Sequence, residues 1–178
     1  MKLKKSLALI LAFCMVLSSM GTVVFAEDAV KSVNVSTPED LADALTSGDK
    51  NIAVTLEKDI EVPISSLGEQ TPGSGEYKLG GENTESIVID LNTYKLTITT
   101  TYMSAIGAKN DNATITIKNG SMTSTGNSAT TWNINDLIFA NCNYLFENVV
   151  FDKEVALTNT GKNAVMRDSR ATAVQPRI

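Results

Sequence analysis

The sequence predicts an all-β fold in which short parallel strands stack in successive coils. Three observations predict this fold class. Segments of alternating apolar residues recur within the period of roughly 20–50 residues that is typical of stacked-repeat proteins. Three of these segments are followed by an asparagine, a residue suited to sharp corners. No long helical pattern lies between Val54 and Phe151, which argues against an α/β fold.

The repeated unit covers residues 54–56, 87–92, 115–120 and 144–149, and each copy is followed by a second apolar position. The steps from Leu91 to Ile117 and from Ile117 to Phe146 are 26 and 29 residues. The earlier step, from Leu56 to Leu91, is 35 residues, so we expect an insertion there. The pattern predicts about three or four coils.

Residues 1–26 are predicted to be a secretory signal peptide. Lys2, Lys4 and Lys5 form a basic start, residues 7–17 are apolar, and residues 24–26 suit a signal peptidase. The apolar run is shorter than the ~20 residues that span a bilayer as a helix. We therefore expect a secreted protein, extracellular or at the cell surface, with no stable membrane span after cleavage.

Charge and residue content exclude several functions. The chain has a net charge of −5, and removal of residues 1–26 leaves 20 acidic and 12 basic residues, a net charge of −8. This balance repels nucleic acid and anionic membranes. Only Cys142 remains after cleavage, so no intramolecular disulfide forms. The chain has no histidine, the commonest general base and metal ligand.

Residues 27–50 are predicted to form a strand and a capping helix ahead of the coils. Valines alternate with polar residues over 32–35. Thr37 is a suitable N-cap and Pro38 suits the first helical position. Gly48 ends the helix, whose expected role is to cover the first coil's open apolar face. Its apolar stripe is Leu41, Ala44 and Leu45.

The coils are expected over 51–160, beginning with strands at 52–56 and 60–62. Residues 65–85 contain five glycines and a proline and are predicted to be an exposed excursion from the array. In the later strands, Ile115 and Ile117 are expected to point inward and Thr116 outward. Threonine favours extended backbone and presents a hydroxyl, and these strands contain Thr97, Thr99, Thr100, Thr101, Thr114, Thr116, Thr123 and Thr125.

Asn92, Asn119 and Asn148 are predicted to form a structural turn ladder. Each follows an apolar strand, where the chain must bend. Asparagine tolerates positive φ and can bond its neighbouring backbone. If equivalent corners stack, the side-chain amides can also hydrogen-bond to one another along the array.

With these elements, the chain resembles right-handed parallel β-helix proteins of the pectate-lyase-like superfamily, especially secreted bacterial ones. The segments that carry the resemblance are residues 36–45, 53–60, 89–96 and 114–120, and it covers residues 33 to about 152. It implies a single-stranded right-handed parallel β-helix. It indicates fold more than function, because this superfamily includes polysaccharide lyases, glycoside hydrolases, adhesins and surface proteins without known activity.

The resemblance does not assign catalytic residues. In the enzymes it would imply calcium held by clustered aspartates with an Arg or Lys base, or paired catalytic aspartates. This chain has no arginine before Met166 and no adjacent aspartates. No catalytic, cofactor-binding or metal residue is therefore assigned.

Some side chains remain weaker candidates. Asp59 and Glu61, with Glu57 and Asp90 near them, could supply a glycosidase's carboxylates or bind Ca²⁺, but a solvated outer face is the favoured interpretation. Cys142 is expected to be a small buried residue. Aromatic residues could stack on sugar rings, although packing against the coil is the favoured account; they are Tyr77, Tyr94, Tyr102, Trp132 and Tyr144.

Residues 161–178 are predicted to be a truncated or atypical C-terminal tail. All three arginines, Arg167, Arg170 and Arg177, lie there. The tail either begins another coil, with Asp168 at the asparagine position, or is an unrelated ending. Without an amphipathic cap, the C-terminal edge would be open to self-association.

The expected function is a non-catalytic surface, adhesin-like or scaffold module that presents a flat β face to extracellular polysaccharide or a surface protein. The alternative is an N-terminal fragment or remnant of a polysaccharide-degrading enzyme, a lyase or a glycoside hydrolase. A third alternative is a nonfunctional truncated product.

Overall fold

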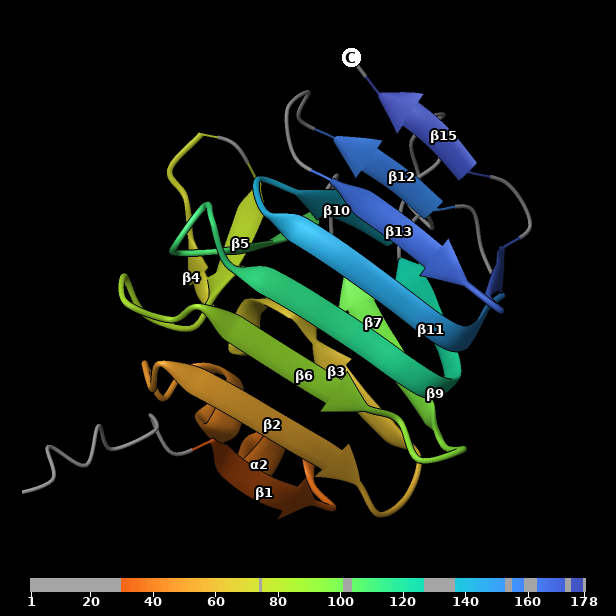
Figure 1. Cartoon of the computed structure of the whole chain (residues 1–178), viewed down its shortest axis with the longest axis horizontal. Coiled ribbons are helices and arrows are strands. Elements are labelled where there is room, and N and C mark those ends of the chain that lie inside the picture. Colours follow the sequence, from red (N-terminus) through yellow and green to blue (C-terminus); the bar gives the residue numbers. More distant parts are fainter. Residues whose placement is uncertain are drawn as a thin grey trace, which may run out of the picture.

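The computed structural model describes residues 30–73, 75–100, 104–126, 137–152, 155–158, 163–171 and 174–177. Within these residues the protein is mostly β, with one short α-helix and one 3-10 turn. The expectation of a β fold with a short N-terminal helix is therefore confirmed. Figure 1 shows the strands stacked from β1 and α2 at one end to β13 and β15 at the other.

The chain begins with β1 (Lys31–Val35) and α2 (Pro38–Leu45). The strands that follow in the first half are β2 (Asn51–Leu56), β3 (Ile60–Pro63), β4 (Glu69–Gln70), β5 (Glu76–Leu79), β6 (Ser86–Asp90) and β7 (Lys95–Thr100), with the 3-10 turn at Ile64–Ser66. The second half contains β8 (Ala105–Ala108), β9 (Thr114–Gly126), β10 (Leu137–Ala140), β11 (Asn143–Phe151), β12 (Val155–Thr158), β13 (Ala164–Arg167), β14 (Arg170–Ala171) and β15 (Val174–Arg177).

The larger sheet is parallel throughout and bends at the middle of its longest strands. One part has the order β1-β2-β6-β9-β11-β13. The other part contains β3, β7, the second half of β9, the end of β11 and β14. β9 and β11 pass through both parts, so they carry the sheet around a corner and curl it into a half-barrel.

A second sheet has the order β15-β12-β10-β8-β5-β4. Its strands are parallel except for β4, which pairs antiparallel with β5. Parallel neighbours require the chain to cross over between them. Here those crossovers run through the larger sheet: β9, for example, lies between β8 and β10 in the sequence.

The core lies between the sheets and is built from equivalent positions of successive strands. Val54, Ile89, Ile117 and Phe146 are partners in adjacent strands, and each is at most 4% exposed. Such rows pack the apolar side chains of neighbouring strands against one another. In the β10 and β11 region the row becomes aromatic, with ring centroids of Phe139 and Phe146 5.0 Å apart.

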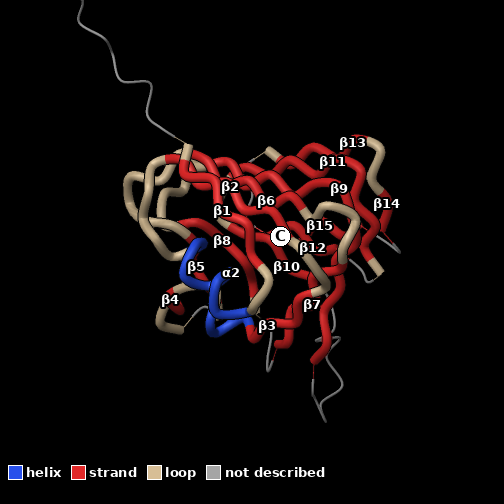
Figure 2. Tube along the Cα trace, turned by 90° about the horizontal axis from the view of Figure 1, so that it is seen from below, coloured by secondary structure: helices blue, strands red, loops and turns tan. Residues whose placement is uncertain are grey.

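Helix α2 covers the first end of this core. Thr37 is its N-cap, and the hydroxyl accepts a hydrogen bond from the Asp40 backbone N–H at 3.1 Å. Pro38 occupies the first turn, where its missing N–H costs nothing. The stripe of Leu41, Ala44 and Leu45 is buried. Figure 2, viewed from below, shows α2 at the same end of the molecule as β1.

The repeat spacing inferred from the sequence is wrong in one step. Ile89, rather than Leu91, pairs with Ile117, so this step is shifted by two residues. The physical reason is the length of the corner: residues 91–94 after β6 lie opposite only Asn119 and Gly120 in β9. Gly120 accommodates this wider turn, because a Cβ there would lie 2.5 Å from the Tyr94 carbonyl oxygen.

The expectation of an exposed excursion over 65–85 is wrong for β5. This strand pairs with β8 in the second sheet, and Tyr77 and Leu79 belong to the core. The glycines lie at the turns around it, including Gly73 and Gly80 with positive φ. The alternation of polar and apolar residues over 76–79 therefore indicates the strand, whereas the high glycine content around it indicates only the turns.

The described C-terminal residues form paired strands. β13 pairs with β11, β14 with β11, and β15 with β12, all in parallel. Arg167 is the partner of Glu147, and Asp168 follows it with a φ of 49°. Asp168 therefore follows β13 at the position that corresponds to Asn148 in β11.

Candidate functional site

A regular row of polar residues runs across the paired strands β3, β7 and β9. Thr97 pairs with Thr123 and Thr99 with Thr125, so four hydroxyls form two cross-strand rows. Because strand neighbours lie about 4.8 Å apart and alternate residues share a face, this arrangement is flat and periodic. We call it the threonine face: Thr97, Thr99, Thr123 and Thr125, with Glu61, Lys95 and Asp152 at its margin.

Three members of the threonine face, Thr97, Thr123 and Thr125, line an open groove of ≈570 Å³. Its other lining residues are Glu61, Lys95, Ser124, Gly126 and Asp152. Thr97 and Thr99 are half-buried and Thr125 is exposed, while Thr123 is more enclosed at 6% exposure. The Thr99 hydroxyl is a hydrogen-bond partner of Glu61 at 3.2 Å and lies 3.4 Å from the Thr125 hydroxyl. The Thr99–Thr125 row is thus held in place by its neighbours. Thr97, Thr99 and Thr125 remain accessible to solvent, whereas Thr123 is buried.

An ion pair borders this groove. The Lys95 ammonium lies 3.1 Å from the Asp152 carboxylate, and each side chain is a little under half exposed. The Lys95 backbone N–H also donates to Asp59 at 2.9 Å, which fixes the start of β7. A positive and a negative group therefore lie beside an array of neutral hydroxyls.

The three predicted turn asparagines all have left-handed backbone, with φ of 48° at Asn92, 60° at Asn119 and 54° at Asn148. The Asn148 amide donates to the Asn119 side chain at 3.5 Å, a weak contact. Asn119 donates to both Asp90 carboxylate oxygens, at 3.2 and 3.3 Å. Asn92 donates instead to the Leu56 carbonyl at 3.1 Å. Because the register after β6 is shifted by two residues, Asn92 does not align with Asn119, and the asparagine ladder does not extend to Asn92.

A feature that the sequence reasoning missed lies just before these corners. Asp90, Lys118, Glu147 and Arg167 are successive cross-strand partners with alternating charge. Lys118 pairs with Asp90 at 3.4 Å and Arg167 with Glu147 at 3.0 Å. We call this row the charge ladder. The sequence contained a signal for this row. Each of its four residues directly follows the inward residue of its own strand that aligns with Val54.

The acidic candidates do not gather as a catalytic pair. Asp59 accepts from the Lys95 backbone, Glu61 from Thr99, and Glu57 from Asn34 at 3.1 Å. Asp90 belongs to the charge ladder. Each carboxylate thus has a separate structural partner. Among the described residues, no group of three or more acidic or cysteine side chains is placed to hold a metal ion.

Cys142 is buried at 1% exposure, as expected. Burial raises the pKa of its thiol to about 11. Hydrogen bonds with the Tyr144 side chain and with the Ala108 backbone lower the pKa and offset only part of this effect. The Tyr144 hydroxyl lies 2.7 Å from the carbonyl oxygens of Ile106 and Ala140 and accepts from the Ala140 N–H at 3.1 Å. This cluster joins β8, β10 and β11 and supplies no reactive thiolate.

The aromatic candidates divide between the core and undescribed segments. Tyr77 and Tyr144 are buried, and Tyr94 is partly buried against the core. Tyr102 and Trp132 lie outside the described residues. None of the described tyrosines is an exposed platform for a sugar ring.

Comparison of the chain with protein-family models, with curated proteins and with solved structures found no match. In the part of the chain that the structure describes, no helix is both long and apolar enough to traverse a membrane.

Proposed function

We propose that the chain is a right-handed parallel β-helix of the pectate-lyase-like type. The support is the order of parallel neighbours, in which successive strands return to the same sheets. Residues with positive φ lie at equivalent positions in β9, in β11 and directly after β13, and such repeated sharp turns agree with a coiled path. The helix α2 corresponds to the N-terminal cap of such a stack.

For function, we propose a secreted, non-catalytic surface or scaffold module that binds carbohydrate on the threonine face. The observation that carries this proposal is the set of solvent-accessible threonines on the paired strands β7 and β9, which are Thr97, Thr99 and Thr125. A hydroxyl both donates and accepts, as sugar hydroxyls do. The flat groove suits an extended glycan better than a small enclosed ligand. Neutral polysaccharides are favoured over polyanions, because the chain is acidic overall.

The absence of catalysis is part of the proposal. Glycoside hydrolysis uses two carboxyl groups on either side of the scissile bond, roughly 5–9.5 Å apart. Glu61 and Asp152 border the groove, but Glu61 is held by Thr99 and Asp152 by Lys95. These partnerships favour a binding surface over an acid–base pair.

The experiment measures binding of the full chain, expressed with its leader, to soluble neutral and acidic polysaccharides. The double variant Thr97→Val/Thr125→Val removes the two accessible threonine hydroxyls that line the groove and keeps β-branched shape. Thr116→Val is the matched control, because Thr116 lies in β9 outside the threonine face. We expect the double variant to weaken binding to neutral glycans at least about tenfold, a free-energy change of ~1.4 kcal/mol, and the control to leave it unchanged.

The same mixtures distinguish the alternative function. New reducing ends or unsaturated sugars, formed by the wild-type chain, would favour the remnant of a polysaccharide-degrading enzyme. Equal binding by the wild-type chain and the double variant would reject the threonine face. Absence of binding to all tested glycans would reject the carbohydrate proposal.

A further inference from the structure

One outer row of the larger sheet is mainly aliphatic. It consists of cross-strand partners on β2, β6, β9, β11 and β13, which are Ala53, Val88, Thr116, Leu145 and Val165. We call these residues the aliphatic row. Val165 is 42% exposed and the others are half-buried. Figure 1 looks onto this face of the sheet, and no described element lies over it. In the part of the chain that the structure describes, the row is therefore an uncovered apolar surface.

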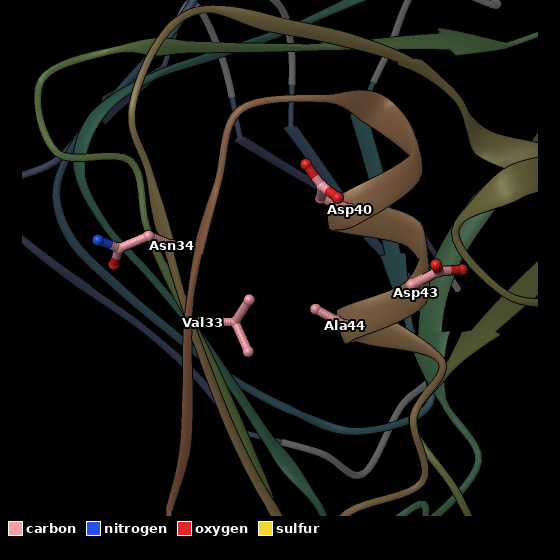
Figure 3. Close-up of a pocket in the computed structure, with 5 residues that line it drawn as sticks. All are labelled: Val33, Asn34, Asp40, Asp43 and Ala44. Carbon is pink, nitrogen blue, oxygen red and sulfur yellow. The ribbon is translucent and has the colours of Figure 1, made fainter.

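Polar rows border the aliphatic row on both sides. The charge ladder lies two residues further along each strand, from β6 to β13. The row on the other side is uncharged and contains Asn51, Ser86, Thr114 and Asn143. An apolar centre with a polar rim is the usual anatomy of a protein–protein interface. The acidic groove between β1 and α2, drawn in Figure 3, is different, because its residues Asp40 and Asp43 give it a single sign of charge.

The order of charges in the ladder identifies the partner that fits this face. From β6 to β13 the signs are negative, positive, negative and positive. Read in the opposite direction, every sign is reversed. A second copy that presents the same ladder in reverse strand order therefore places an opposite charge at every position. An unrelated sheet has no reason to match this alternation.

We propose that two copies of this chain pack face to face through the aliphatic row, related by a twofold axis parallel to the strands and midway between β9 and β11. This rotation turns the face over, keeps the strand direction and reverses the strand order. Lys118 then lies opposite Glu147 of the other copy, and Asp90 lies opposite Arg167 of the other copy. Each member of the charge ladder thus meets an opposite charge across the interface.

The same axis aligns the two aliphatic rows. Val88 lies opposite Val165 of the other copy, and Thr116 lies opposite Leu145 of the other copy. Aligned sheets pack ~10 Å apart with interdigitating side chains, so these residues bury one another. Because both copies use the same surface, the contact closes at the dimer.

The charges also fix where the axis lies. An axis along β9 would place Lys118 against Lys118 of the other copy and Asp90 against Glu147 of the other copy. Like charges brought together across an interface suppress that arrangement. An axis between β9 and β11 avoids both contacts.

The face is charge-balanced although the chain is acidic. The net charge of −5 opposes contact between two copies in general. Within the ladder, Lys118 pairs with Asp90 at 3.4 Å and Arg167 with Glu147 at 3.0 Å, so dimerisation buries no unpaired member of the ladder. The threonine face lies on the other part of the sheet. The inference goes beyond glycan binding and does not depend on it.

The first test follows association of the full chain by sedimentation velocity from about 1 μM to about 1 mM. The face is smaller than a standard interface of ~20–30 residues per partner, so we expect a weak, reversible dimer. The weight-average sedimentation coefficient should rise with concentration toward the value of a dimer. A monomer at every concentration would overturn the proposal and leave the aliphatic row to a different partner. Growth beyond the dimer would overturn the twofold arrangement.

A charge swap tests the register of the ladder without changing net charge. Glu147→Lys/Arg167→Glu keeps opposite charges at these two neighbouring positions but makes the order negative, positive, positive, negative. Reversal of this order places a like charge at every position across the interface. We expect the dimer of this variant to dissociate at least about tenfold more readily than that of the wild type. Wild-type association by the folded variant would overturn the proposed axis.

The matched control also swaps two charges. Lys118→Glu/Glu147→Lys gives the order negative, negative, positive, positive, which is still opposite at every position after reversal. It disturbs more ion pairs within the chain than the first swap does, yet its dimer should stay within about threefold of the wild type. Loss of the dimer in this folded control would count against the ladder. Circular dichroism and thermal melting establish that each variant is folded.

Leu145→Thr tests the aliphatic row with a substitution that suits a strand. Because the twofold axis places this position in the interface twice, the variant should weaken the dimer severalfold. Thermal melting separates this effect from a loss of fold. A folded variant that associates as strongly as the wild type would overturn packing through the aliphatic row.

Discussion

At the scale of single residues, the corners of this fold depend on asparagine and aspartate. Asn119, Asn148 and Asp168 adopt positive φ at equivalent positions, where most side chains are strained. Their short polar side chains tolerate this backbone. Asn119 donates to Asp90 and Asn148 donates to Asn119, each in the preceding strand segment. These two asparagines therefore both bend the chain and tie neighbouring strands together.

Replacement of Asn119 separates these two roles. Asn119→Gly keeps the backbone unstrained and removes the hydrogen bonds to Asp90, whereas Asn119→Ala adds strain from its Cβ. We expect Asn119→Ala to lower the free energy of unfolding by ~1–2 kcal/mol more than Asn119→Gly does, measured by urea denaturation. Equal losses would show that the backbone at this corner carries no conformational cost.

The buried cluster of Cys142 and Tyr144 makes stability sensitive to alkaline pH. Burial raises the pKa of Cys142 from 9.0 to about 11 and that of Tyr144 well above its usual value. Above pH 9 the unfolded chain loses the thiol proton while the folded chain keeps it, so unfolding becomes favoured. The stability from Cys142 is complete below pH 9 and is lost as pH rises toward 11.

The corresponding measurement compares urea unfolding of the wild type and Cys142→Ala at pH 8 and pH 11. Two pKa units correspond to ~2–3 kcal/mol, so the wild type should lose about that much more stability than the variant. Parallel losses in the two proteins would contradict a protonated thiol in the folded state. Alanine suits the site because a buried cysteine packs as a small apolar residue.

At the scale of elements, the sequence identified strands whose two faces differ. β2 and β6 alternate buried and half-buried residues, and both were predictable from period-two patterns. β8 shows no alternation because all four of its residues are buried. The register after β6 could not be read from the sequence. Leu91 continues the alternation of the inward residues Ile87 and Ile89, although it lies in the turn after the strand. The accessible positions of Thr97, Thr99 and Thr125 agree with the expectation of outward threonines, whereas that expectation is wrong for the buried Thr100 and Thr123. The convergence of threonines in one groove required the strand pairing.

The cap of α2 is the element with the clearest single-residue test. Thr37→Ala removes the hydrogen bond to the Asp40 N–H and should lower the free energy of unfolding by ~0.5–2 kcal/mol. Thr37→Ser retains a capping hydroxyl and should stay within a few tenths of a kcal/mol of the wild type. Thermal or urea unfolding measures both variants. An equal loss in Thr37→Ser would assign the effect to the threonine methyl group instead of the cap.

At the scale of the whole molecule, the composition of the core changes along the stack of strands. The inward residues are aliphatic in β2 and β6 and aromatic in β11, and the β13 partners of these aromatic residues are Ala164 and Met166. Helix α2 packs beside β1 and β2 at the first end. The two ends of the described structure are therefore not equivalent.

The alternating charge ladder imposes a parity rule on the number of neighbouring strands. Asp90, Lys118, Glu147 and Arg167 change sign at every step. Deleting the single strand that carries Lys118 would place Asp90 beside Glu147, and duplicating it would place two lysines side by side. Like charges directly opposite in a sheet are destabilising. Removing or copying two adjacent strands of the ladder keeps every neighbouring pair opposite in charge. A lineage that lengthens or shortens this sheet would accordingly tolerate changes in pairs of strands more readily than changes of one.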